Sequence, residues 1–230
     1  MLNMEVKAQR KRAPRQSREE RSNAILTAAR RVFERDGYAA AKMTDIAADV
    51  GVVEGTVFHY FPSKRALVTR VMEVFYQTIT RRVDAGLRQT SGTYESLHLL
   101  ILTHLTVMRD NAELCSVILN SSRDADKDLS QDIRQLNRNY THAIVDILKQ
   151  GIAAGELRSD TSIPLVRNTV YGSIEHAMWV QLADAQAIDV ETNARQLTDL
   201  IYRGICVESQ IAHNDEVAAL VTKLNNMIAD

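Results

Sequence analysis

The sequence comprises 230 residues with a formal net charge of -1 at pH 7; 45% of the residues are hydrophobic and only 5% are aromatic. A chain of this length can bury a sizeable core and suits one large or two small domains. Its most apolar stretch, 97–108, is too short to span a membrane, and residues 1–17 hold no apolar run that would make a secretory signal. Cys115 and Cys206 stand far apart without a CxxC pair, which favours neither a zinc site nor a disulfide. We therefore expect a cytoplasmic protein with no metal, no cofactor and no membrane partner.

Positive charge is concentrated near the start of the chain. Residues 1–70 hold 14 lysines and arginines against 8 aspartates and glutamates, whereas the remaining residues hold 14 against 21. A basic head on an acidic body is typical of a protein that binds nucleic acid at one end only.

A helix is expected to begin at Ser17. Ser17 and Glu20 have the spacing of a capping box, and the apolar positions that follow share one helical face until Gly37 ends the pattern. That face consists of Ile25, Ala28, Ala29, Val32 and Phe33. We expect it to be the scaffold against which the next two helices pack.

Residues 44–64 read TDIAADVGVVEGTVFHYFPSK and predict two short helices joined by a glycine turn. Thr44 is a suitable N-cap for the first helix. Gly51 stands where a helix end favours a left-handed residue. The second helix can begin at 53–55 and must end by Phe61, because a proline follows. Two short helices joined in this way form a helix-turn-helix.

This stretch resembles the DNA-binding signature of the TetR family of bacterial transcriptional regulators. The matching positions are Thr44, Ile46, Ala47, Gly51, Val52, Gly55, Thr56, Phe58, Tyr60, Phe61 and Lys64. Val50 departs from the pattern by replacing a common alanine, and Val53 by replacing a frequent serine or threonine. The second departure removes a hydroxyl that could cap the helix or contact a phosphate. The resemblance implies a DNA-binding domain at 17–62 and a larger helical effector-binding and dimerisation domain at 63–230.

The resemblance also implies which side chains contact double-stranded operator DNA. Phosphate contacts are expected from Thr44, Thr56, Tyr60 and Lys64. The other exposed positions of the recognition helix are expected to be Val53, Glu54, Gly55 and His59. Of these, Glu54 and His59 are candidates for reading base edges, although a surface carboxylate that limits non-specific binding is an equal alternative for Glu54. We expect Val57, Phe58 and Phe61 to face inward or to pack the corner of the motif.

Residues 1–16 are polar and basic, so we expect a flexible arm. The alternative is a solvated terminus that contacts nothing. Beside a DNA-binding unit such an arm can follow phosphates or enter the minor groove, and its candidate contacts are Arg10, Lys11 and Arg12.

The rest of the chain is expected to be all-α. No proline occurs between Pro62 and Pro164, and apolar residues recur at helical spacing throughout. Helices are expected over 63–86, 94–108, 112–120, 129–152, 162–182 and 190–211. A final amphipathic segment, 213–230, goes beyond what the family requires.

We expect a homodimer, because one recognition helix reads only a few base pairs and useful specificity needs two half-sites. In the family, the last two long helices of each subunit pair across a two-fold axis. The corresponding apolar stripes here are Val166, Val170, Ile174, Met178, Leu182, Leu197, Ile201 and Ile205, with Gly172, Ser173 and Gly204 allowing close approach. Each stripe could equally be core within one chain, and we favour a split between the two roles.

The resemblance places an effector pocket among the middle helices. The candidate lining residues are Phe75, Leu100, His104, Met108, Leu119, Arg123, Tyr140, Ile144, Tyr171, Glu175, Met178 and Trp179, and for any one of them a plain core or surface position is the commoner outcome. Methionine and tryptophan beside a few polar groups suit a small hydrophobic effector with a polar head. We favour a long-chain acyl compound, free or as a coenzyme A thioester, over aromatic or cationic drugs. Its binding would change the spacing of the two reading heads and release the DNA.

Two other function classes compete with this interpretation. Catalysis has little support, because the sequence lacks a glycine-rich phosphate loop, GxSxG and HExxH. A DNA-bound interaction protein of the same fold, such as a nucleoid-occlusion factor controlled by a protein partner, would show an exposed apolar patch and no enclosed cavity. We favour the ligand-responsive regulator, with repression as the usual sign in the family.

Overall fold

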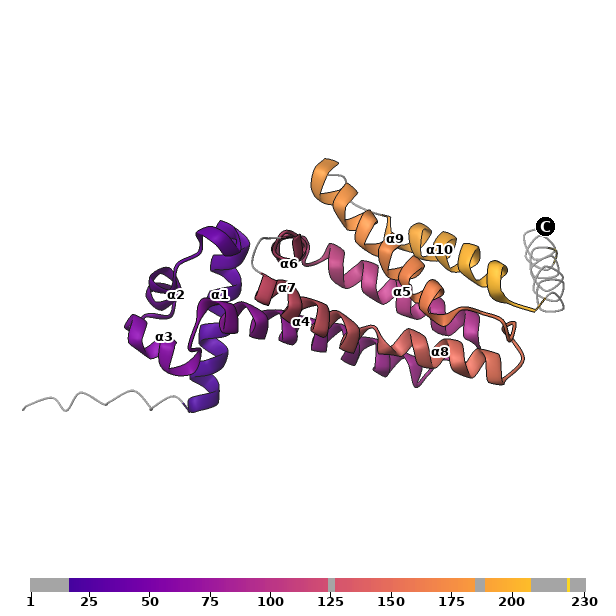
Figure 1. The fold of residues 1–230 in the computed structure, drawn as a ribbon, viewed down its shortest axis with the longest axis horizontal. Helices are drawn as coiled ribbons and strands as arrows, with labels where there is room; N and C mark the ends of the chain where they lie inside the picture. The colour runs from indigo at the N-terminus through magenta and orange to yellow at the C-terminus, as the bar shows by residue number, and fades with distance from the viewer. Residues whose placement is uncertain (1–16, 124–126, 185–188, 208–222, 224–230) are drawn as a thin grey trace, which may run out of the picture.

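The computed structural model describes residues 17–123, 127–184, 189–207 and 223. Within these ranges the chain is helical apart from turns and one isolated antiparallel bridge. The helices are α1 (Arg18–Ala40), α2 (Met43–Val50), α3 (Glu54–Tyr60), α4 (Lys64–Leu87), α5 (Thr93–Arg109), α6 (Ala112–Arg123), α7 (Lys127–Tyr140), α8 (His142–Ala153), α9 (Ile163–Asp184) and α10 (Val190–Ile205). Helices α1–α3 form a head at one end of an elongated molecule, and α4 leads from it into a bundle with α5–α10 (Figure 1). None of the described helices is long and apolar enough to cross a membrane.

The first helix begins as predicted. The Ser17 hydroxyl accepts a hydrogen bond from the backbone N–H of Glu20 at 3.1 Å, and the Glu20 carboxylate accepts one from the backbone N–H of Ser17 at 2.7 Å. All five residues of the predicted apolar face are buried. The helical pattern is interrupted at Gly37, whose φ is 72°, and a further turn then extends α1 to Ala40. The capping box and the buried face are therefore confirmed.

Lys64, the first residue of α4, fastens the end of α1. Its Nζ donates hydrogen bonds to the backbone carbonyls of Tyr38, Ala39 and Ala41 at 2.8, 3.0 and 3.0 Å. The same ammonium lies 4.8 Å from the centre of the Tyr38 ring. Carbonyls at the end of a helix lack intrahelical partners and favour a nearby cation. Because α2 and α3 lie between these two points in the chain, this contact closes the head.

The prediction of one helix over 129–152 is wrong. The chain forms two helices, α7 and α8, that meet at Thr141. The Thr141 hydroxyl donates to the backbone carbonyl of Asn137 at 2.8 Å, and its backbone has φ -81° and ψ 8°. A side-chain hydroxyl that bonds back to the preceding turn bends or interrupts a helix.

The last described helix ends earlier than predicted. Helix α10 stops at Ile205 rather than near 211, because Cys206 turns to an extended conformation and pairs with Leu157. The Arg158 backbone N–H donates to the Ile205 carbonyl at 2.9 Å. The predicted amphipathic segment 213–230 lies almost entirely outside the described residues.

Most of the apolar residues expected to form a dimer surface are buried within the chain instead. Those with less than a tenth of their surface exposed are Val166, Val170, Ile174, Met178, Ile201 and Ile205. For these six the intrachain alternative is right, because α9 and α10 both pack on α5. The apolar residues that α9 and α10 leave exposed are Leu165, Val180 and Leu200, of which Leu200 is 71% exposed.

Candidate functional site

The helix-turn-helix has the predicted turn. Gly51 ends α2 in a left-handed conformation, with φ 74° and ψ 38°, and its N–H points back to the carbonyls of Ala47 and Ala48. Helix α3 follows after residues 51–53 and ends at Tyr60, after which the chain is extended. The Val53 side chain offers no cap to α3, as its apolar character predicted.

Thr44 does not cap α2, so that prediction is wrong. The helix begins at Met43, with Lys42 in the N-cap position and no side-chain cap. The Met43 side chain is buried in the core of the head, which places the start of the helix one residue earlier. Thr44 is therefore exposed within the first turn, where its hydroxyl is accessible.

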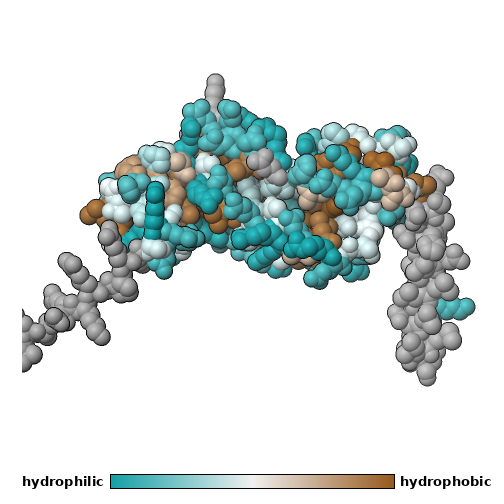
Figure 2. All heavy atoms as spheres, turned by 90° about the horizontal axis from the view of Figure 1, so that it is seen from below, coloured by the Kyte–Doolittle hydropathy of each residue, from teal (hydrophilic) through white to brown (hydrophobic). Residues whose placement is uncertain are grey.

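The outer surface of α3 presents a mixed set of side chains. Of the two placements predicted for Phe58, the inward one is wrong, because Val57 and Phe61 already occupy the buried side and leave Phe58 43% exposed. Val53 is 74% exposed. The other predicted contacts are exposed at Glu54, Gly55 and His59 and half-buried at Thr56 and Tyr60. Figure 2 shows apolar surface among polar side chains at this end of the molecule.

Two groups of predicted DNA contacts are not simply exposed side chains of the helix-turn-helix. The Lys64 ammonium already donates to three carbonyls, so a phosphate contact by Lys64 would have to displace one of them. Arg10, Lys11 and Arg12 lie outside the described residues.

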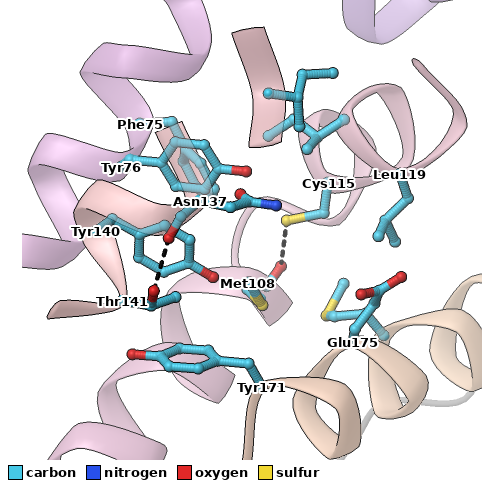
Figure 3. A pocket seen from close by; sticks show the side chains of 13 residues that line it. Phe75, Tyr76, Met108, Cys115, Leu119, Asn137, Tyr140, Thr141, Tyr171 and Glu175 are labelled. Carbon is cyan, nitrogen blue, oxygen red and sulfur yellow. Dashed lines mark hydrogen bonds between the residues drawn. The ribbon is translucent and has the colours of Figure 1, made fainter. Parts of the chain in front are cut away.

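The body encloses a cavity of about 150 Å³. It is bounded by α4, α5, α6, α7 and α9, and Figure 3 shows its wall. The lining residues are Phe75, Tyr76, Met108, Cys115, Ile118, Leu119, Ile133, Asn137, Tyr140, Thr141, Tyr171, Glu175 and Met178. The wall is mainly aromatic and aliphatic, and Glu175 supplies its one charged side chain among the residues named. Asn137 and Glu175 are also exposed to solvent, so they mark the opening.

Seven of the twelve predicted pocket residues line this cavity: Phe75, Met108, Leu119, Tyr140, Tyr171, Glu175 and Met178. Leu100, His104 and Ile144 are almost completely buried behind the wall, and Trp179 is partly buried outside it. The side chain of Arg123 is outside the described residues. Sequence analysis did not single out Tyr76, Cys115 and Asn137. Each lies on a helix that packs on several sides, and helical spacing alone does not show which of those sides borders the cavity.

Three tyrosines and a histidine form an aromatic cluster at one side of the cavity. The rings of Tyr76 and Tyr140 stack with centroids 4.4 Å apart and an interplanar angle of 8°. Tyr171 meets Tyr140 edge to face at 5.6 Å, and His104 lies behind them, 5.2 Å from Tyr171. Tyrosine hydroxyls are neutral donors at neutral pH, and burial raises the pKa of all three still further above its ordinary value. Burial lowers the pKa of His104 to about 4, so its ring is neutral too.

Cys115 lines the opposite part of the cavity as a thiol. Burial raises its pKa to about 12, and its Sγ lies 3.8 Å from the Met108 carbonyl oxygen. A buried thiol with a raised pKa is unreactive. The wall therefore offers apolar surface, neutral donors and one carboxylate, which suits binding rather than covalent chemistry.

Helices that line the cavity also hold the head. Asn111, just before α6, accepts a hydrogen bond from Arg30 of α1 at 2.6 Å. Arg65 near the start of α4 pairs with Asp128 at 2.8 Å and with Asp132 at 3.3 Å, both on α7. A displacement of α6 or α7 at the cavity would thus act on α1 and α4.

Comparison with known proteins identifies the family. Residues 25–71 match the family described as bacterial regulatory proteins, tetR family, and residues 69–204 match the YsiA-like protein C-terminal region. The chain belongs to the tetR family of bacterial regulatory proteins. As a tetR-family member it is a DNA-binding transcriptional regulator.

The tetR-family relatives include a fatty acid metabolism regulator protein of Bacillus subtilis (strain 168), 24% identical over 79% of this chain and 93% of that protein. The HTH-type transcriptional repressor KstR2 of Mycolicibacterium smegmatis is 26% identical over 70% of this chain and 78% of that protein. Among solved structures, the transcriptional regulator FadR from Bacillus subtilis in complex with stearoyl-CoA is 23% identical, with a TM-score of 0.74 over 80% of this chain and 98% of that one. That likeness shows the fold.

Proposed function

We propose that this regulator is a repressor that a long-chain acyl coenzyme A thioester releases from its operator. The cavity carries this proposal, because its wall is apolar and aromatic and its opening bears polar groups, which is the composition that suits an acyl chain with a polar head. The relative whose structure is similar was solved with stearoyl-CoA. A single carboxylate in the wall argues against an effector with several positive charges.

The size of the cavity supports a mechanism for release. About 150 Å³ is less than the roughly 300–1,000 Å³ of typical ligand pockets, so a long acyl chain must push the lining helices apart. Helices α6 and α7 carry six of the lining residues. Asn111, the partner of Arg30, lies just before α6, and Asp128 and Asp132, the partners of Arg65, lie in the first two turns of α7. Opening the cavity would therefore reorient the head, with a coupling free energy of about 1–3 kcal/mol as in other allosteric proteins.

Release from the operator by a change in the spacing of the DNA-reading heads requires two heads. The proposal therefore includes a homodimer formed through α9 and α10. These helices lie along one side of the bundle (Figure 1). Their exposed residues Leu165, Val180 and Leu200 would be covered by a partner, and Gly172 and Ser173 border a groove between them where a partner's helix could approach closely.

The DNA contacts are proposed from α3 and the first turn of α2. Thr44, Thr56 and Tyr60 would bind phosphates through hydroxyls, while Glu54 and His59 would face base edges. Their exposure or half-burial in the structure supports this arrangement.

The test is fluorescence anisotropy of the full chain on labelled DNA from upstream of its own gene, with competitor DNA to establish specific binding. Palmitoyl-CoA or stearoyl-CoA should lower the anisotropy at micromolar concentration, and coenzyme A alone should not. Specific binding that no acyl thioester reverses would contradict this proposal and favour the alternative, a DNA-bound protein controlled by a protein partner.

A further inference from the structure

Two tyrosine hydroxyls face the cavity without a protein partner. Tyr76 comes from α4 and Tyr140 from α7, and their stacked rings place both hydroxyls on the same side, toward Cys115 and Asn137 (Figure 3). Among the described residues neither hydroxyl makes a hydrogen bond. The Tyr171 hydroxyl also lacks a hydrogen-bond partner among the described residues, but it is buried and points to the opposite side in the same view, away from the stacked pair.

A saturated hydrocarbon would be a poor partner for this part of the wall. An alkyl chain lying against Tyr76 and Tyr140 would exclude water from two donors and give them nothing to bind, which is costly for any buried polar group. A carbonyl oxygen has two lone pairs and can accept from both hydroxyls at once. The stacked pair is therefore matched to a ligand oxygen.

The charge of the wall limits which oxygen fits. Both hydroxyls are protonated at neutral pH, as tyrosine ordinarily is, and burial raises the pKa of each further, so they donate without carrying charge. The carboxylate of Glu175 faces the same cavity (Figure 3) and would repel a second carboxylate. These features favour a neutral carbonyl over a free carboxylate.

We propose that Tyr76 and Tyr140 form a carbonyl-binding pair that receives the thioester carbonyl of the acyl effector. This assignment rests on the function proposed above and adds the point at which the ligand is anchored. It places the thioester inside the cavity, with the acyl chain among the apolar side chains and the coenzyme A portion leaving past Asn137 and Glu175. The pair is thus a specificity determinant for acyl thioesters over ligands of equal length that lack the carbonyl.

The test compares palmitoyl-CoA with S-hexadecyl-CoA, a thioether in which a methylene replaces the carbonyl, by calorimetric titration of the full-length protein. The wild type should bind the thioester roughly tenfold or more tightly, equivalent to about 1.4 kcal/mol per factor of ten. The double variant Tyr76→Phe/Tyr140→Phe should bind the two ligands about equally. Tyr171→Phe is the matched control, since it removes a hydroxyl from the same cluster and should keep the wild-type preference.

If the wild type binds the two ligands with equal affinity, the carbonyl-binding assignment is wrong while the proposed function stands. This comparison requires no variant. A preference that survives in the double variant would overturn it as well, because the carbonyl would then be recognised elsewhere. If the wild type binds neither ligand, the proposed function fails and the assignment fails with it.

Discussion

Replacing Lys64 with methionine separates a structural role from a DNA contact. Methionine keeps the apolar stem but removes the ammonium, which donates to the Tyr38, Ala39 and Ala41 carbonyls at 2.8–3.0 Å. A hydrogen bond to a charged group contributes roughly 1.5–3 kcal/mol. Because the site is only half-buried, water can replace part of the loss. We therefore expect Lys64→Met to lower the free energy of unfolding by about 2–4 kcal/mol, measured by urea denaturation.

The same variant should report on DNA through the salt dependence of binding. If Lys64 acts by closing the head, operator affinity should fall by a similar factor at every salt concentration. A direct phosphate contact would instead make the slope of log Kobs against log salt shallower by about 0.9. Lys42→Met is the matched control, because it removes an equal charge from an exposed position of the same head and should change stability by less than about 0.5 kcal/mol. Unfolding of Lys64→Met at the wild-type urea concentration would refute the reasoning.

Three further predictions concern the body. His104 has a pKa of about 4 in the folded protein against an ordinary value of 6.5. Between these two pH values the unfolded chain binds a proton that the folded protein excludes. The stability that the neutral ring allows is therefore fully present above pH 6.5 and is lost as the pH falls toward 4. Denaturation at pH 7 and pH 4 should show about 3 kcal/mol less acid destabilisation in His104→Leu than in the wild type, and equal losses would contradict this. Leu200→Asp should shift light scattering from dimer to monomer mass without lowering the unfolding temperature of the subunit, and an unchanged dimer would exclude this face. Asn111→Ala removes the acceptor for Arg30 and should leave acyl thioester binding intact while reducing its effect on operator affinity; a full effect would mean that the coupling runs through other contacts.

The sequence predicted elements well where one local signal decided the outcome. The capping box at Ser17, the left-handed residue at Gly51 and the missing cap at Val53 each depend on neighbours within a few positions. Helix ends that depend on distant residues were predicted less well. Helix α10 stops where Cys206 pairs with Leu157, about 50 positions earlier in the chain, and no local pattern announces that contact.

Prediction of the cavity was limited by the same physics. Helical spacing shows that a face is apolar, but it does not show whether that face meets another helix or an empty volume. His104 and Tyr140 both had a plausible pattern, yet His104 lies behind the wall and Tyr140 forms it. Tyr76 was missed because it is adjacent to Phe75, and only the position of α7 brings both residues to the cavity.

Leu119→Trp tests whether occupation of the cavity releases the operator. Leu119 lines the cavity from α6 and is half-buried, so a larger ring at this position should fill the volume without disturbing the head, while Leu119→Ala keeps it open. Operator anisotropy should be titrated with palmitoyl-CoA for the wild type and both variants. We expect all three proteins to bind the operator alike and only Leu119→Trp to resist release. If palmitoyl-CoA releases Leu119→Trp at the concentration that releases the wild type, the effector acts outside the cavity and the proposed mechanism is wrong.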